Sequence, residues 1–371
     1  MSVLLKGQFF EGISQKELVT QLVGKKKARE KLPTWFNTPN IYYPGKINFE
    51  QTSSEQTGRY KATLVCGKDL IDITGGFGVD SYFFSKRMDR VVHCEIDAQL
   101  SEIAAHNAKA LSCANIKSVA RDGIRFLTEC NNQFDWAYAD PSRRNDVKGR
   151  VFRLSDCYPD ITEHLNSIFG KTAQLLLKTS PLLDIKQGIL TLQSVKEIHV
   201  VALKNEVKEL LWVLKKGYSG DIKIKTINLK DTGNEVFDFQ LNDEKNTPLA
   251  VGLPKEYLYE PNAAILKAGA FKTIGKHFGV TKLHVHSHLY TATALINFPG
   301  RRFKIKHIVA YQKRLFQKLG IDTANITTRN FSETVATIRK KLKIREGGET
   351  YLFFTTTNEK KRVIIVCEKI H

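Results

Sequence analysis

The chain of 371 residues carries a formal net charge of +19 and is 42% hydrophobic, which predicts two or three domains with apolar cores. A basic excess of this size indicates a polyanionic partner such as RNA or DNA, or else a solvated basic surface without one. There is no apolar run of about eighteen residues and no apolar signal region, so we expect a cytoplasmic protein without a membrane span. Because the six cysteines form no Cys-x-x-Cys pair, we expect neither disulfides nor a cysteine-bound zinc ion.

Residues 1–62 are predicted to form an auxiliary helical segment, because apolar residues recur at helical spacing between 14 and 23. A basic run follows that we expect to face solvent or RNA phosphates: Lys25, Lys26 and Lys27. Trp35 and Phe36 either stack on an RNA base or pack this segment onto the next domain. The Thr-Ser-Ser-Glu sequence at 52–55 has the spacing of a capping box and predicts a further helix.

A strand, a glycine-rich turn and a helix are predicted in succession from Asp69 to Asp80. The apolar run 70–73 indicates a buried strand, and 74–78 contains glycines that let a ligand approach the backbone. Asp80 and Ser81 are expected to cap the helix that follows. The simpler alternative is a glycine turn that only shortens a loop.

Further apolar runs are separated by helical stretches, and each ends in polar side chains. They cover residues 90–97, 116–120, 134–139 and 175–178. Such a series predicts a doubly wound α/β sheet, whose parallel strands end at one ligand-binding edge. The carboxylates expected at this edge belong to Glu95, Asp97, Asp122 and Asp140.

The catalytic domain is predicted to span residues 63–245. Within it, 197–202 reads as a strand and 205–214 as a helix. The alternating segments 222–227 and 235–239 are predicted to form an antiparallel pair that closes the sheet.

Residues 246–300 are predicted to hold a linker and a small ferredoxin-like or helical domain, with one helix over 261–278. His284, His286 and His288 alternate and would share one face of a strand, so a metal site has to be considered. We predict none, because no acid or cysteine lies nearby to complete the ligands.

The last segment, 301–371, reads as strand, helix, strand, helix and strand pair, with its second helix over 331–342. It opens with basic residues that we expect to contact RNA phosphates: Arg301, Arg302, Lys304 and Lys306.

This ordered series of motifs resembles bacterial class I S-adenosylmethionine (SAM)-dependent methyltransferases that carry a C-terminal THUMP-like domain. The resemblance covers most of the chain and includes residues 31–35, 50–55, 140–144 and 257–262. It implies a Rossmann-like seven-stranded sheet, an N-terminal helical segment, a C-terminal α+β domain and S-adenosylmethionine as cofactor. It also implies structured RNA, such as tRNA or rRNA, as the partner.

The resemblance further implies residue roles. The glycine turn would give the methionine part of the cofactor room, Glu95 would bind ribose hydroxyls, and Asp122 with Gly123 would flank adenine. Asp97 either binds the cofactor or caps the following helix. The implied cofactor-binding residues are Asp72, Thr74, Gly75, Gly76, Gly78, Glu95, Asp97, Asp122, Gly123 and Asp140.

Asp-Pro-Ser-Arg-Arg stands where amine methylases carry an Asp-Pro-Pro-Tyr signature. Ser142 replaces a proline and Arg143 replaces the aromatic residue that stacks on the target base, which puts the base-amine mechanism in doubt. An arginine can stack on a base or clamp a phosphate, or instead pair with a nearby acid such as Asp146 or Asp156. The implied catalytic residues are Asp140, Pro141, Arg143 and Arg144.

Two other side chains near this edge have alternative readings. Lys178 either contacts the substrate backbone or pairs with a neighbouring acid. Cys157 is not expected to act as a nucleophile for carbon methylation, because it does not closely follow Asp140 and Pro141.

The sequence therefore predicts a SAM-dependent RNA methyltransferase. One alternative is a methyltransferase of a protein or small molecule. The other is an RNA-binding protein that binds SAM without transferring its methyl group.

Overall fold

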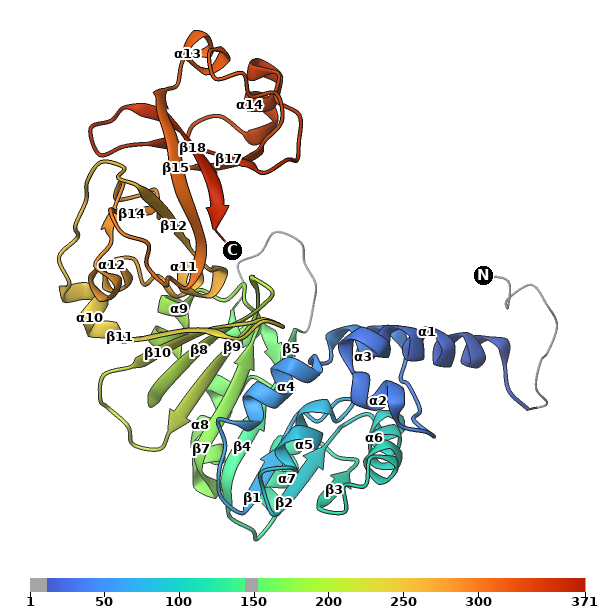
Figure 1. Cartoon of the computed structure of the whole chain (residues 1–371). Coiled ribbons are helices and arrows are strands. Elements are labelled where there is room, and N and C mark those ends of the chain that lie inside the picture. The colour runs from blue at the N-terminus through green and yellow to red at the C-terminus, as the bar shows by residue number, and fades with distance from the viewer. Residues whose placement is uncertain (1–11, 144–152, 371) are drawn as a thin grey trace. The chain divides into compact units, whose positions relative to one another are not determined.

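The computed structural model describes residues 12–143 and 153–370 (Figure 1). Its contacts divide the chain into two compact units. The first comprises Met1–Ile198 and Glu209–Gly220, and the second comprises His199–Lys208 and Asp221–His371. The glycine-rich turn belongs to the first unit.

The N-terminal segment is helical, as predicted. It contains α1 (Gln15–Lys31), α2 (Pro33–Asn37), α3 (Lys46–Gln51) and α4 (Glu55–Ala62). Trp35 is 1% exposed, and its ring lies against those of Phe77, Tyr82 and Phe83. Packing, and not an exposed stacking surface, therefore accounts for Trp35.

The capping box predicted over 52–55 does not form. α4 begins at Glu55, and Ser54 is its N-cap, with the side-chain oxygen accepting from the backbone N–H of Thr57. The Glu55 carboxylate instead accepts hydrogen bonds from the backbone N–H and the hydroxyl of Thr34, at 2.9 and 2.8 Å. Glu55 thus links α4 to α2.

The large sheet has nine strands in the order β11-β10-β8-β9-β7-β4-β1-β2-β3. Its strands are β1 (Asp69–Asp72), β2 (Arg90–Cys94), β3 (Ile116–Val119), β4 (Phe134–Ala139), β7 (Thr172–Thr179), β8 (Val195–Leu203), β9 (Glu206–Lys215), β10 (Lys223–Leu229) and β11 (Glu235–Gln240). β1 pairs in parallel with β2 and β4, β2 with β3, and β4 with β7. The carboxyl ends of these five strands therefore meet at one edge, as predicted.

Helices alternate with the parallel strands. They are α5 (Val79–Phe84), α6 (Ala98–Ala110), α7 (Gly123–Glu129), α8 (Ile161–Lys171) and α9 (Ile185–Thr191), while α10 (Leu241–Asn246) follows β11. A short ribbon of β5 (Ser142–Arg143) and β6 (Cys157–Tyr158) comes after β4, with the 3-10 helix η2 (Leu154–Asp156) before β6.

Asp80 and Ser81 do not cap α5, contrary to the prediction. The N-cap is Gly78, whose φ of 82° is left-handed, so the helix starts one residue before Asp80. Both predicted caps lie inside the helix and are buried.

The segment predicted as a helix over 205–214 is the strand β9, antiparallel to β7. Lys204 and Asn205 both have positive φ, 50° and 66°, the backbone of a tight hairpin turn. The apolar run Leu210–Leu214 is buried, and a continuous apolar run has no period that separates a strand from a helix. The pair β10 and β11 was predicted correctly, and it extends the sheet to nine strands instead of seven.

The second unit contains a seven-stranded sheet in the order β13-β14-β12-β15-β18-β17-β16. Its strands are β12 (Tyr257–Pro261), β13 (Thr281–Lys282), β14 (Tyr290–Ala292), β15 (Gly300–Ala310), β16 (Asn325–Arg329), β17 (Thr350–Thr356) and β18 (Arg362–Ile370). Phe354 belongs to one apolar cluster and Phe353 to another. Adjacent residues of β17 thus pack on opposite faces of the sheet.

The helices of this unit that follow β12 are α11 (Ala263–Ala268), α12 (Thr273–Phe278), α13 (Lys313–Gln317) and α14 (Val335–Leu342). The single helix predicted over 261–278 is broken, because Gly269, with φ 75°, ends α11 in a left-handed cap. α14 begins later than predicted, since Thr334 is its N-cap. The order of strands and helices after residue 300 is otherwise as predicted.

The three alternating histidines do not lie on a strand, because His284, His286 and His288 occupy the turn between β13 and β14. The ring of His288 stacks on that of Phe271 with a centroid distance of 3.8 Å. Within the described ranges, no three His, Cys, Asp or Glu side chains are grouped as metal ligands. Nor does any described helix have the length and apolar character that crossing a membrane requires.

Candidate active site

The three glycines of the turn after β1 serve different purposes. A Cβ on Gly75 would lie 2.3 Å from Nε2 of His93, so packing alone requires this glycine. Gly76 and Gly78 have left-handed backbones, with φ of 57° and 82°. A Cβ on Gly76 would meet only the carbonyl oxygen of Thr74, at 3.9 Å. Gly76 is therefore the point at which a ligand can approach the backbone closely.

Glu95 ties the glycine turn to the end of β2. One carboxylate oxygen accepts a hydrogen bond from the N–H of Gly76, and the other accepts from the N–H of Asp97, both at 2.8 Å. The Asp97 side chain accepts from the N–H of Leu100 at 3.1 Å and caps α6. Of the two alternatives for Asp97, capping is the one that the described contacts contain.

Asp122 is held at the start of α7. Its Oδ1 accepts from the N–H of Arg125 at 2.8 Å, and its Oδ2 accepts from the hydroxyl of Tyr158 at 2.9 Å. A Cβ on Gly123 would lie 2.2 Å from the carbonyl oxygen of Ile73, so glycine lets α7 start directly against the end of β1. The sequence analysis missed Tyr158, which the short β5–β6 ribbon brings to this edge.

Asp72 is a buried carboxylate beneath the turn, 1% exposed. It accepts hydrogen bonds from the backbone N–H of Thr74 at 3.1 Å and from the hydroxyl of Ser81 at 2.7 Å. Burial raises the pKa of Asp72 to about 7, and the nearby Asp80 and Asp140 charges add to the shift. The hydroxyl of Thr74 in turn accepts from the N–H of Asp140 at 2.6 Å, which joins the ends of β1 and β4.

Asp140 follows β4 directly, and its carboxylate forms an ion pair with Lys178. Lys178 lies on β7, whose Leu177 is in register with Ala139 of β4. Of the two readings of Lys178, the structure contains the pairing with a neighbouring acid. The side chains of Asp140 and Lys178 are 30% and 14% exposed, so both reach the surface of the edge.

A second cation lies beneath this pair, where no solvent reaches it. Nζ of Lys61, on α4, is 3.0 Å from the Asp80 carboxylate, 3.1 Å from that of Glu209 and 2.7 Å from the hydroxyl of Ser53. Asp80 also accepts from the hydroxyl of Tyr138 at 2.7 Å. We call Lys61, Asp80 and Glu209 the buried ion cluster.

The buried ion cluster and the Asp140–Lys178 pair influence one another. Burial raises the pKa of Glu209. Burial opposes ionisation of Asp80 as well, but the charges of Lys61 and Lys178 outweigh it and hold the pKa of Asp80 below its usual value. Burial would likewise lower the pKa of Lys178, and the carboxylates of Asp140, Glu209 and Asp80 raise it instead. Lys178 is therefore a protonated ammonium at neutral pH.

The rest of the predicted catalytic motif is described only in part. Pro141 lies half-buried after Asp140, and Ser142 pairs with Tyr158 in the β5–β6 ribbon. Arg144 lies outside the described residues, so its predicted role stays a prediction, as does that of the Arg143 side chain. Cys157 is 1% exposed, a setting unlike that of a reactive thiolate.

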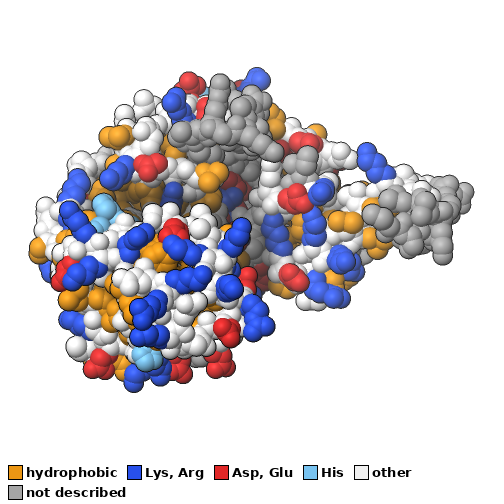
Figure 2. All heavy atoms as spheres, turned by 90° about the horizontal axis from the view of Figure 1, so that it is seen from above, with side chains coloured by type: hydrophobic (Ala, Val, Ile, Leu, Met, Phe, Trp, Pro, Cys, Tyr) orange, Lys and Arg blue, Asp and Glu red, His pale blue; other side chains and the backbone are white. Residues whose placement is uncertain are grey.

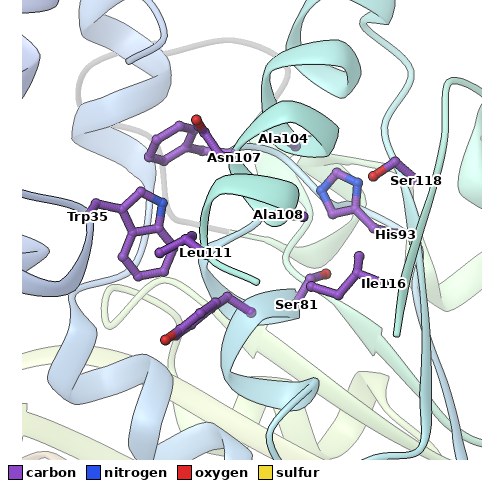
Figure 3. A pocket seen from close by; sticks show the side chains of 12 residues that line it. Trp35, Ser81, His93, Ala104, Asn107, Ala108, Leu111, Ile116 and Ser118 are labelled. Carbon is purple, nitrogen blue, oxygen red and sulfur yellow. The ribbon is translucent and has the colours of Figure 1, made fainter. Parts of the chain in front are cut away.

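A small cavity lies behind the glycine turn (Figure 3). Its volume is about 10 Å³, and Trp35, Ser81, His93 and Asn107 are among its lining residues. This volume holds about one water molecule, so the cavity is not the cofactor site. His93 is 1% exposed and has no hydrogen-bond partner among the described side chains and backbone.

The β15 residues that were predicted to bind RNA do not share one face of the strand. Arg301 pairs with the buried Glu260, whose other oxygen is 2.7 Å from Arg329. Strand alternation places Arg302 and Lys304 on the opposite face of β15 from Arg301, and Lys306 pairs with Glu368 at 2.7 Å.

In α1, Lys27 pairs with Glu50 at 2.6 Å, Lys25 lies 5.9 Å from the ring of Phe36, and Lys26 is exposed. Figure 2 shows Lys and Arg side chains dispersed among acidic and neutral ones on the visible face. The predicted RNA contacts remain predictions.

Comparison with known proteins gives independent evidence on the domains and the fold of this chain. Residues 257–299 match the family model of a ferredoxin-like domain, and residues 300–369 match that of a THUMP domain-like region. A crystal structure from Porphyromonas gingivalis W83, of a protein assigned as a methyltransferase, has a TM-score of 0.90 and 29% identity over 100% of this chain and 94% of that one. Uncharacterized S-adenosylmethionine-dependent methyltransferases of two Mycobacterium tuberculosis strains are 22% identical over 80% of this chain and 79% of theirs.

The strand order, the glycine turn and the acids at successive strand ends define a class I methyltransferase fold. With these relatives and the C-terminal match, the chain is an S-adenosylmethionine-dependent methyltransferase with a THUMP-like domain. Its cofactor is S-adenosylmethionine, and the open space at Gly76 leaves room for a ligand beside the backbone.

Proposed function

We propose that this methyltransferase acts on RNA. The observation that carries the proposal is the THUMP domain-like region at 300–369 attached to a methyltransferase fold. The net charge of +19 supports it, because lysines and arginines that neutralise phosphates supply most of the sequence-independent affinity for nucleic acids. A tRNA or rRNA is the substrate class that we propose.

We further propose which residues hold the cofactor, in line with the sequence analysis. Gly76 gives the methionine part room, and Asp72 lies below it. Glu95 would bind the ribose hydroxyls and Asp122 would flank adenine, since they follow β2 and β3 at the same edge of the sheet. Bound there, S-adenosylmethionine supplies an electrophilic methyl group. The structure assigns Gly75 a packing role in addition, because His93 fills the space beneath it.

Asp140 is the residue that we place at the methyl acceptor. Its backbone is fixed by Thr74 and by the restricted geometry before Pro141, and its carboxylate by Lys178. The acceptor is therefore held at a rigid strand end, which is the main requirement of an in-line displacement.

The experiment is transfer of labelled methyl groups from S-adenosylmethionine to RNA isolated from cells that lack the gene. We expect label in RNA, and none in DNA or total protein from the same cells. Label in protein or in small molecules only would contradict the RNA proposal and support the first alternative. Binding of S-adenosylmethionine without any transfer would support the second.

A further inference from the structure

Two strand ends bring an ammonium and a carboxylate together at the acceptor position. Asp140 ends β4 and Lys178 lies near the end of β7, and the two strands are parallel neighbours. Both side chains are partly exposed at the edge, and they are paired with each other. An acceptor that reaches Asp140 therefore also meets Lys178.

The buried ion cluster acts on this pair through its charges, because the carboxylates of Glu209 and Asp80 raise the pKa of Lys178. Lys61 is 0% exposed and cannot touch a substrate, yet it forms ion pairs with Glu209 and Asp80 and a hydrogen bond with Ser53. Glu209 lies on β9, whose Leu211 is in register with Lys178 on β7. Since buried ion pairs add little net stability, the main consequence of such a cluster is the fixed orientation of the groups around it.

The ammonium of Lys178, which donates hydrogen bonds, lies where the methyl group is received, and it distinguishes an attacking oxygen from an attacking nitrogen. A hydroxyl oxygen has one proton and two lone pairs, so it can donate to Asp140, accept from Lys178 and still direct a lone pair at a methyl carbon. The exocyclic amine of a base has a single, delocalised lone pair. An ammonium beside that amine would donate a hydrogen bond to its single lone pair, which is then not available for the attack, so the pair favours a hydroxyl.

The sequence after Asp140 also favours a hydroxyl as the methyl acceptor. A base amine is gripped by an aromatic ring that stacks on the base, and Arg143 occupies the position of that ring. The motif therefore lacks this ring, and a guanidinium at its position can clamp a phosphate as well as stack on a base. Inside an RNA strand, the hydroxyl that every nucleotide carries is the ribose 2′-hydroxyl.

We infer that the methyl acceptor is a ribose 2′-hydroxyl, held between Lys178 and Asp140, and not an amine of a base. This inference rests on the proposal that the substrate is RNA. Glu209 acts as a positioning residue, because its charge acts on Lys178 and not on the acceptor directly.

The transfer balances without a further reactant. The hydroxyl oxygen forms the new bond to the methyl carbon while the carbon–sulfur bond breaks, and the bonding electron pair stays on sulfur. The O–H proton moves to the Asp140 carboxylate as the oxygen becomes acidic, and then to water. Lys178 stabilises negative charge that the oxygen gains while the proton moves.

Alkaline hydrolysis of the labelled RNA tests the inference. The 2′-oxygen is the nucleophile in alkaline cleavage, so a methyl group on it protects the adjacent phosphodiester bond. After transfer by the full-length protein, we expect the label in alkali-stable dinucleotides. Label in mononucleotides would overturn the inference and leave the RNA proposal standing, whereas absence of label from RNA contradicts the RNA proposal itself.

Two variants test the roles of Asp140 and Lys178 in methyl transfer. Asp140→Asn and Lys178→Met are each expected to lower single-turnover transfer about a hundredfold or more, with little change in affinity for S-adenosylmethionine. The matched control is Lys215→Ala, an exposed lysine at the opposite end of β9 from Glu209. Because Lys178→Met leaves a carboxylate unpaired, Lys178→Arg is tested beside it as a variant that retains the cation. Parent-like transfer by Lys178→Met would overturn the assignment.

Discussion

Gly75 and Gly76 are neighbours in the sequence, yet different parts of the molecule require them to be glycine. Gly75 is required by the ring of His93 below it, and Gly76 by its left-handed backbone and the open space above it. A sequence motif does not distinguish the two glycines, because it shows only that small residues recur. At the residue scale, the structure separates a glycine that packing requires from one that borders open space.

Gly76→Val is therefore expected to abolish S-adenosylmethionine binding by filling the open space, with a moderate loss of stability from its left-handed backbone. Gly75→Ala is expected to lower the melting temperature more, because its Cβ would collide with His93. Calorimetric titration and thermal unfolding of both variants check this. Unchanged cofactor affinity in Gly76→Val would remove Gly76 from the site.

The raised pKa of Asp72 predicts that the free energy of unfolding depends on pH. Its folded-state pKa is raised by burial to about 7, whereas an unfolded aspartate titrates near ~3.9. The folded state thus binds the proton more tightly, so the stability from this group is present below about pH 4 and is lost as pH rises through about 7.

Asp72→Asn removes this titration while keeping an acceptor for Thr74 and a partner for Ser81. Relative to the parent, the variant should gain stability between about pH 4 and pH 8, by on the order of a few kcal/mol. Urea unfolding at several pH values is the measurement. Parallel curves of unfolding free energy against pH for the two proteins would show that Asp72 is ionised in the folded state over this pH range.

At the element scale, the buried ion cluster joins segments that are far apart in the chain. α4, α5 and β9 supply Lys61, Asp80 and Glu209. Lys61 and Glu209 belong to no predicted motif, and only the pairing of β9 with β7 brings Glu209 to the edge that β4 also reaches.

Lys61→Met should destabilise the protein by on the order of 3–5 kcal/mol, because it leaves buried carboxylates without their cation. Adding Glu209→Gln should restore part of the loss by removing one of these charges. Urea unfolding of the single and double variants measures both effects, with Lys215→Ala as a control that should remain within ~0.5 kcal/mol of the parent. Equal stability of the parent and Lys61→Met would show that the cluster is not ionised as described.

At the scale of the whole molecule, the basic excess is divided between residues already engaged and residues that face solvent. Arg301 is committed to Glu260, so reversing its charge would disturb the second unit and would not report on RNA alone. Lys304 is exposed, and Lys306 makes only a surface pair with Glu368. These two lysines test the RNA proposal with the least effect on the fold.

Lys304→Glu with Lys306→Glu should weaken RNA binding and lower the slope of log affinity against log salt by about 1.4–1.8, if both side chains contact phosphates. Affinity for S-adenosylmethionine should not change. The control is Lys215→Glu with Lys216→Glu, two exposed lysines of the first unit. A salt slope equal to that of the parent would mean that Lys304 and Lys306 face only solvent.

The sequence alone determined the features that depend on neighbouring residues. The glycine turn, the acids Glu95 and Asp140 at strand ends, and the strand–helix order after residue 300 follow from local pattern, because apolar period and glycine position are set within a few residues. The strand β9 could not be predicted from local sequence. Its buried run Leu210–Leu214 has no hydrophobic periodicity, so its neighbours in the sheet decide its conformation.

Only the tertiary structure decided which charges meet. Lys61 and Glu209 are 148 positions apart and Asp140 and Lys178 are 38 apart, and no spacing rule joins such residues. Their meeting follows from strand order, which places β4, β7 and β9 side by side and ends β4 and β7 at one edge. The sequence therefore specified a methyltransferase, whereas the side-chain pair that selects the acceptor arose from packing, because hydrogen bonds and ion pairs depend on distance in space and not along the chain.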